Sequence, residues 1–226
     1  MSERSCYFFC IVSDLETLAA TTPPAPAEQA DGRRRRGHAT RESILQTAAD
    51  LASVEGLEGL TIGRLASELG MSKSGLFAHF GSKEELQLAT IEAARRRFVE
   101  HVVRPSRELP RGRARVEALL DDWLGYLRGE VFRGGCFFCS AQSEFDSRPD
   151  SPVRALIIEQ LQQFVAFLER ELRQAQEAGE LDAQADPAQL AFELDALGTA
   201  ANRHYQLFHD PAAIDRAAAG MRARLG

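Results

Sequence analysis

The 226-residue sequence predicts an all-α fold. Apolar residues recur at three- and four-residue spacing in long segments, which is the period of a helix with one buried face. No run alternates between apolar and polar residues as a half-buried strand does. The 9 prolines and 17 glycines fall mostly between the periodic segments, where they are expected to end helices.

The chain is expected to begin with a disordered extension over residues 1–36 that has a basic end. Apolar side chains cluster at residues 7–12, and a stretch rich in proline and alanine follows at residues 21–30, which is typical of a flexible linker. Four arginines, Arg33–Arg36, stand directly before the first strong helix. They are interpreted below with the helices that they precede.

The first strong helix is predicted over residues 41–55, with Thr40 as its N-cap because a threonine hydroxyl can accept a bond from a free backbone N–H of the first turn. Gly56 is expected to end the helix in the left-handed conformation. The side chains expected on its buried face are Ile44, Ala48, Leu51 and Ala52.

Residues 61–80 predict two short helices joined by a tight turn. Thr61 is the expected cap of the first helix, and Gly70 is the expected left-handed residue at its end. Ser72 is the expected cap of the second helix, which carries small polar side chains on one side. This order is typical of a helix-turn-helix unit, in which the second helix enters the major groove of DNA.

A long helix is predicted after Gly81. Ser82 and Glu85 form a capping box, in which each side chain bonds a backbone N–H near the other residue. The helix is expected to run to Arg104, immediately before Pro105. It would link the helix-turn-helix to the rest of the chain.

The second half predicts a series of further amphipathic helices. Ser151 and Asp186 are the expected N-caps of the two longest, and Pro187 suits the first position of its helix. The expected segments are a helix that follows Pro110 and runs to about Gly129, a short apolar segment at 136–145, a helix from Ser151 to Gly179, a helix from Asp186 to about Phe208 and a last helix from Asp210 to about Leu225.

The formal net charge of −6 is unevenly distributed. Residues 33–104 hold 12 Lys and Arg against 9 Asp and Glu, whereas residues 105–226 hold 14 against 19. The basic part therefore coincides with the helix-turn-helix, and the acidic part would be repelled by phosphate. No apolar run of 18 residues exists, so no membrane span is predicted. The four cysteines are expected to stay free thiols in the reducing cytoplasm.

These residues resemble the TetR family of bacterial transcriptional regulators over residues 39–98. The resemblance implies a DNA-binding domain at 37–98 and a helical effector-binding and dimerisation domain at 99–226. It also implies a homodimeric repressor of a palindromic operator, released by a small, mostly apolar ligand, without a cofactor. The residues that carry the resemblance are Ile44, Ala48, Leu51, Gly56, Thr61, Ile62, Leu65, Ala66, Gly70, Ser72, Lys73, Leu76, Phe77, Phe80, Lys83 and Leu86.

The DNA-contacting residues expected from this reading lie mostly on the second helix of the pair. Phe77 departs from the family pattern, which often has a tyrosine whose hydroxyl reaches a phosphate, so that contact is absent here. Arg33–Arg36 are interpreted as an arm for phosphates or the minor groove rather than a solubilising tail. The full set of expected DNA contacts is Arg41, Thr61, Ser72, Lys73, Ser74, Gly75, Phe77, His79 and Lys83.

The resemblance also implies an effector cavity and a two-fold interface in the second half. Aromatic side chains are the candidates for the cavity wall, although each one alone is equally typical of core packing. The expected effector contacts are Trp123, Tyr126, Phe137, Phe138, Phe164 and Phe167. The expected dimer contacts are Leu190, Leu194, Leu197, Ala201 and Tyr205.

Cys136 and Cys139 leave three interpretations open. A structural zinc site needs four ligands, and no second cysteine pair or suitably spaced histidine pair lies nearby. Packing in a core or pocket wall is favoured, and a thiol- or redox-responsive regulator is the alternative. A helical enzyme is a remote alternative, because no catalytic constellation is found and the adjacent Asp121 and Asp122 point in different directions on their helix.

Overall fold

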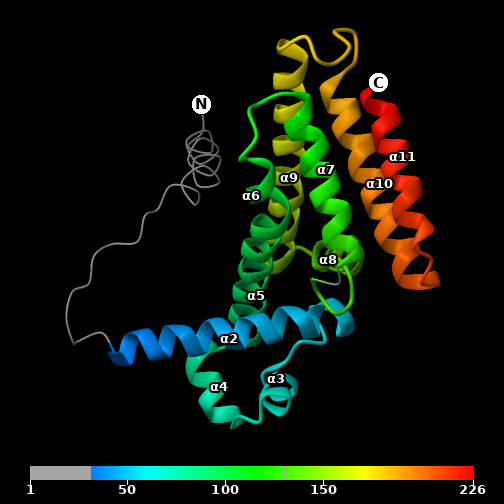
Figure 1. Cartoon of the computed structure of the whole chain (residues 1–226). Coiled ribbons are helices and arrows are strands. Elements are labelled where there is room, and N and C mark those ends of the chain that lie inside the picture. The colour runs from blue at the N-terminus through cyan, green and yellow to red at the C-terminus, as the bar shows by residue number, and fades with distance from the viewer. Residues whose placement is uncertain (1–31, 130) are drawn as a thin grey trace. The chain divides into compact units, whose positions relative to one another are not determined.

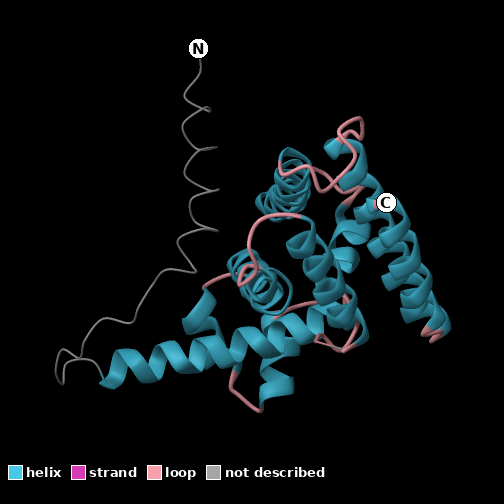
Figure 2. Cartoon of the chain, turned by 45° about the horizontal axis from the view of Figure 1, so that its top comes forward, coloured by secondary structure: helices cyan, strands magenta, loops and turns pink. Residues whose placement is uncertain are grey.

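The computed structural model of the chain describes residues 32–129 and 131–226. The chain divides into two units, with the boundary between Ala39 and Thr40. The expectations for residues 1–31 lie outside the described residues. Within the described ranges every regular element is helical (Figure 2), which confirms the predicted all-α fold. No helix in these ranges is both long and apolar enough to cross a membrane.

Helix α2 spans Gly32–Glu55, so the predicted start at Arg41 was wrong. Arginine and alanine are strong helix formers and no proline interrupts this stretch, so the helix continues through Thr40 instead of beginning there. The helical backbone at 32–36 likewise shortens the predicted disordered extension. The side chains of Arg33–Arg36 lie outside what the structure describes, so their role as an arm stays a prediction. Gly56 ends the helix with φ +81°, as predicted.

Helices α3 (Ile62–Leu69) and α4 (Lys73–Phe80) form the predicted pair. The Thr61 hydroxyl accepts a bond from Arg64 N at 3.0 Å, and the Ser72 hydroxyl accepts one from Gly75 N at 3.1 Å. Gly70 ends α3 in the left-handed conformation, with φ 63°. Both helices lie below α2 in Figure 1. The caps therefore place the turn as the sequence predicts.

The linking helix contains an irregularity that the sequence reading missed. Helix α5 (Lys83–Phe98), capped by Ser82, continues into the π-helical stretch η1 (Val99–Val103) and then α6 (Arg104–Ser106). Arg104 N donates to Val99 O, five residues back. Pro105 supplies the physical reason, because its ring crowds the preceding turn and its nitrogen donates no hydrogen bond.

Five more helices complete the described chain, and Ser151 and Asp186 cap two of them as predicted. The first of the five begins three residues later than Pro110. Their bounds are α7 (Arg113–Arg128), α8 (Phe137–Phe145), α9 (Pro152–Glu177), α10 (Pro187–Phe208) and α11 (Ala212–Leu225).

The long helices α7, α9, α10 and α11 pack into a bundle with the linking helix (Figure 1). One apolar core runs from Ile44 in α2 to Leu225 in α11. Within the bundle, Gly198 of α10 lies against the ring of Trp123 of α7, where an added Cβ would stand 2.2 Å from the ring. The domain boundary at residue 98 stays a prediction.

Candidate nucleic-acid interface and inner aromatic cluster

Helix α4 divides its side chains between the core and the surface. Leu76 and Phe80 are buried and anchor the helix. Ser72, Lys73 and Ser74 are exposed, and 54% of the Phe77 side chain is accessible. One side of α4 therefore presents a basic and polar surface that also carries an aromatic ring, and this is a composition that suits a DNA groove.

Two of the expected phosphate contacts already serve as helix caps. The Thr61 and Ser72 hydroxyl oxygens accept backbone bonds, as described above, and Ser72 Oγ also lies 3.3 Å from Ser74 Oγ. A capping hydroxyl still has its own O–H to donate. Contact between Thr61 or Ser72 and a phosphate would therefore use that O–H and leave the cap intact.

Arg41 connects α2 to α4. Its Nη1 donates to the backbone oxygen of His79 at 2.6 Å, and its guanidinium lies 4.4 Å from the centre of the Phe80 ring. His79 is partly buried, and its own ring lies 6.2 Å from that of Phe80. The side chain of Arg41 thus holds the end of the exposed helix in place.

Lys83 is engaged within the protein. Its Nζ lies 2.6 Å from Glu58 Oε1, and Arg148 approaches the other oxygen of that carboxylate at 3.6 Å. The hydrogen bond from Lys83 is the main cause that lowers the pKa of Glu58 below its usual range. Among the residues that the structure describes, Lys73 forms no ion pair. Of the two lysines, Lys73 is therefore the better placed to meet a phosphate.

A carboxylate that the sequence reading overlooked holds the loop between α2 and α3. Glu144 of α8 accepts bonds from Leu57 N at 2.7 Å and Glu58 N at 3.0 Å. Gln87 of α5 donates to Leu57 O at 2.8 Å. A Cβ at Gly56 would lie 3.1 Å from the Glu144 carboxylate oxygens. No local motif marks Glu144, because its partners lie more than 80 residues away.

Five of the six expected effector contacts join one aromatic cluster through Phe98 and Phe132. Phe98 contacts Tyr126, Phe138 and Phe164 with ring centres 5.3 to 6.0 Å apart. Trp123 contacts Phe164, and Phe137 contacts Phe138 and Phe132. Most of these pairs meet edge to face, the arrangement that the ring quadrupole favours. Phe167 is buried beside the guanidinium of Arg170 at 5.3 Å.

Two buried polar atoms in this cluster lack a hydrogen-bond partner of good geometry. They are Trp123 Nε1 and the Tyr126 hydroxyl, and their side chains are only 3% and 4% exposed. Burial, with a smaller contribution from the neighbouring Cys136 thiol, raises the pKa of Tyr126 well above its usual value. A buried donor without a partner costs about 1–3 kcal/mol, so this region favours any molecule that brings an acceptor.

The two cysteines of the second half lie at the start of α8. Cys136 is its N-cap residue and is buried, whereas Cys139 is partly exposed. Both thiols are free. Within the described ranges no group of three or more His, Cys, Asp or Glu side chains could hold a metal ion.

Three of the five expected dimer contacts are buried within the chain. Leu190, Leu194 and Ala201 have exposures of 7%, 0% and 3%, so they pack within the single chain and leave no surface for a partner. Leu197 and Tyr205 are partly buried against the same core. The helical period was right, but the sequence could not tell which apolar face of α10 turns inward.

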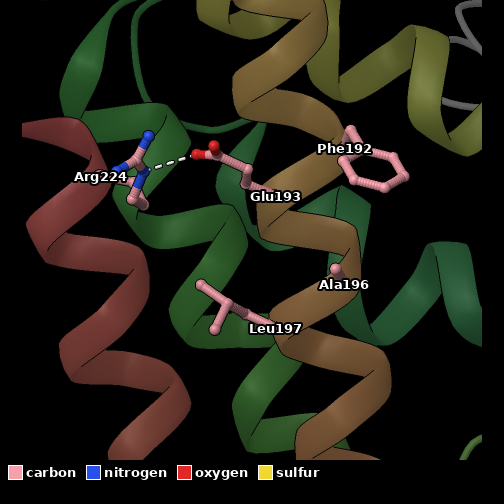
Figure 3. Close-up of a pocket in the computed structure, with 5 residues that line it drawn as sticks. All are labelled: Phe192, Glu193, Ala196, Leu197 and Arg224. Carbon is pink, nitrogen blue, oxygen red and sulfur yellow. Dashed lines mark ion pairs between the residues drawn. The ribbon is translucent and has the colours of Figure 1, made fainter.

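The apolar side chains that α10 exposes lie elsewhere on the helix. Phe192, Leu207 and Phe208 are 65%, 67% and 66% exposed. A shallow groove of about 350 Å³ runs beside Phe192, and Ala196, Leu197 and an ion pair between Arg224 of α11 and Glu193 complete its lining (Figure 3). The outer surface of α10 therefore carries several exposed apolar side chains.

Comparison with known proteins gives matches to both halves of the chain. The family model described as bacterial regulatory proteins, tetR family, matches residues 44–90. The model described as tetracyclin repressor-like, C-terminal domain, matches residues 112–221. Tetracycline repressor protein class C of Escherichia coli is 34% identical over 91 residues, which are 40% of this chain and 36% of that protein. The chain covers 34% to 48% of the length of the curated relatives it matches.

Solved structures match over a larger share of the chain. A TetR transcriptional regulator from Chloroflexus aurantiacus has a TM-score of 0.77 at 23% identity, covering 84% of this chain and 95% of that one. The structure of AibR in complex with isovaleryl coenzyme A and operator DNA has a TM-score of 0.63 at 24% identity, covering 82% and 97%. At these identities the two structures establish the fold of the chain.

Proposed function

The chain belongs to the TetR family of bacterial transcriptional regulators, and on this basis we propose that it is a homodimeric repressor which a small, mostly apolar ligand releases from a palindromic operator. The observation that carries the proposal is the exposed surface of α4. A basic, polar and aromatic surface on the second helix of a helix-turn-helix is what a major-groove reader needs. The tetracycline repressor among its relatives supports the repressor role.

The DNA contacts proposed for α4 fall into two groups. Lys73 and the hydroxyls of Ser72 and Thr61 would bind phosphates and position the helix. Ser74, Gly75, Phe77 and His79 would face the groove, where a phenyl ring can pack on a thymine methyl group. Arg41 and Lys83 would act indirectly, because their side chains hold α4 and the neighbouring loop.

The proposed ligand site is the aromatic cluster around Trp123 and Tyr126. Its rings are in contact, so a ligand would enter by separating them. The two buried donors without partners favour a mostly apolar molecule that carries at least one hydrogen-bond acceptor. The similar structure of AibR was solved in complex with isovaleryl coenzyme A and operator DNA. This supports the proposal that a chain of this fold binds a small molecule as well as DNA.

The proposed link between ligand and DNA runs through two elements next to the cluster. Phe98, which touches three of the rings, immediately precedes η1 in the linking helix. Helix α8 carries Phe137 and Phe138 and also Glu144, which holds the loop before α3. Displaced rings would therefore move both supports of the DNA-reading pair. A coupling of about 1–3 kcal/mol between the two sites is typical and reciprocal.

The DNA half of the proposal is tested by selecting operator sequences with the purified protein and then comparing variants on the best sequence. Lys73→Ala should weaken binding to every sequence and reduce the slope of log K against log salt by about 1. Arg128→Ala is the control, since Arg128 lies on α7 and pairs with Asp215. Unchanged binding and slope in Lys73→Ala would remove this contact, and failure to select any sequence would refute the proposed function.

The ligand half can use the fluorescence of Trp123, the single tryptophan of the chain. Apolar compounds with and without an acceptor are titrated against the protein alone and against its operator complex. A compound of the proposed class should change Trp123 emission and release DNA over the same concentration range. Release of DNA without any change in emission would place the ligand elsewhere.

A further inference from the structure

Cys136 and Cys139 are brought together by one turn of helix. Cys136 caps α8 and Cys139 is its third residue, and Ser140 N donates to Cys136 O at 3.2 Å to close the turn. Residues three apart on one helical turn lie on the same side of the helix, so the two thiols are neighbours. Each sulfur therefore has the other as an immediate neighbour without any rearrangement of the fold.

The surroundings make the two thiols chemically unequal. The hydrogen bond from Cys139 lowers the pKa of Cys136 to about 7, against the opposing effect of burial. The same bond, together with burial, raises the pKa of Cys139 well above its usual value. Of the two thiols, Cys136 is therefore the more readily ionised. This matters for thiol oxidation, because the thiolate is the reactive form.

The turn that holds the cysteines contacts both α10 and α2. Cys136 N donates to the side-chain oxygen of Asn202 on α10 at 2.9 Å. Gly134 N donates to Ser53 Oγ on α2 at 3.0 Å, and a Cβ at Gly134 would overlap the backbone of Ser53. The other end of α8 carries Glu144. A change in the first turn of α8 would therefore affect α2 and α10 directly. Through α8 it would also affect the loop before α3, which Glu144 holds.

We propose that Cys136 and Cys139 form a reversible disulfide under a two-electron oxidant such as hydrogen peroxide, and that the disulfide weakens operator binding. Two thiols and one peroxide yield one disulfide and two molecules of water. Each sulfur loses one electron, the O–O bond of the peroxide breaks, and both thiol protons end in the water. A dithiol reductant reverses the step. The effect on DNA rests on the proposed function, whereas formation of the disulfide does not.

The experiment uses the full chain with Cys6→Ser and Cys10→Ser, so that only the second pair can react. The reduced protein is treated with hydrogen peroxide, digested and analysed by mass spectrometry, and its operator affinity is measured before and after. The peptide that contains residues 136–139 should lose the mass of two hydrogens. Operator binding should weaken by about 5- to 150-fold, and a dithiol reductant should restore both.

The matched control adds Cys139→Ser to the same background and keeps Cys136. After peroxide treatment, its 136–139 peptide should not lose the mass of two hydrogens. Its operator binding should not show a weakening that a dithiol reductant reverses. Two thiols that remain open to alkylation after peroxide would overturn the proposal. A disulfide that leaves operator affinity unchanged would overturn its regulatory part.

The same data separate this inference from the proposed function. A reduced protein that selects no operator refutes the proposed function and the regulatory part together. The mass of the 136–139 peptide then decides the disulfide independently of any DNA measurement.

Discussion

Gly198 shows how much depends on a single position in the bundle. The ring of Trp123 lies where a side chain at 198 would stand, so the absence of a Cβ allows α7 and α10 to pack closely. Trp123 in turn touches Phe164 and so joins the aromatic cluster. Gly198 is thus a packing residue between two helices of the single chain.

We expect Gly198→Ala to destabilise the fold. The new methyl group would overlap the Trp123 ring, and overpacking of this kind costs about 1–3 kcal/mol. Alanine recovers up to about 1 kcal/mol in helix propensity, which leaves a net loss. The measurement is urea unfolding at fixed protein concentration, because association changes apparent stability.

Gly125→Ala is the matched control for this substitution. Gly125 lies in α7, is exposed, and a Cβ there would meet nothing within 4 Å. Only the propensity gain of up to about 1 kcal/mol remains, so this variant should be more stable than the parent chain. Equal effects from the two substitutions would contradict the packing argument.

At the scale of elements, α8 connects the bundle to the helix-turn-helix. It is only nine residues long, yet it contributes two rings to the cluster, Cys139 and the Glu144 carboxylate, and Cys136 is its N-cap residue. The π-helical stretch η1 lies in the linking helix beside the same rings, and such stretches frequently occur at functional positions. A structural change inside the bundle would therefore be transmitted to α3 and α4 through α8 and η1.

We expect Glu144→Gln to loosen the loop between α2 and α3. The carboxylate accepts two backbone bonds, and an amide has one oxygen and no charge, so one charge-assisted bond is lost and the other weakened. A loss of about 1.5–3 kcal/mol corresponds to exchange of the Leu57 and Glu58 amide hydrogens that is at least about tenfold faster. Hydrogen exchange with mass spectrometry measures this rate.

The control for Glu144→Gln is Glu159→Gln on α9. The Glu159 carboxylate accepts a bond from Gln163 on the same helix at 3.0 Å. This change should leave exchange at Leu57 and Glu58 as it was. Unaltered exchange in Glu144→Gln as well would mean that the loop is held by Gln87 and the core alone.

At the scale of the whole molecule, the proposed dimer depends on the outer surface of α10. The side chains of Phe192, Leu207 and Phe208 are exposed to water, which does not stabilise a single chain. Two reading helices one turn of DNA apart, about 34–36 Å, are needed for a palindromic site. The exposed surface of α10, rather than its buried leucines, is therefore the proposed two-fold contact.

We expect the double variant Phe192→Glu and Leu207→Glu to be monomeric, because four carboxylates would meet across the two-fold contact without partners. Operator affinity should fall by about 100-fold or more once the two half-sites are bound independently. Light scattering after size exclusion and DNA titration measure the two effects. Leu109→Glu, at a 39% exposed leucine between α6 and α7, is the control and should change neither. A double variant that remains dimeric would refute this interface.

The sequence by itself determined the all-α class, the positions of most helices, the helix-turn-helix and the family resemblance. These depend on local signals: the Thr61, Ser72 and Ser82 hydroxyls each bond a backbone N–H three residues further on. The tertiary structure alone decided that Leu194 faces inward, that Lys83 pairs with Glu58 and that Glu144 holds a loop more than 80 residues away. Helical spacing shows which face of a helix is apolar, but it does not show which other helix that face packs against. Long-range partners are selected by how the faces of all the helices pack together.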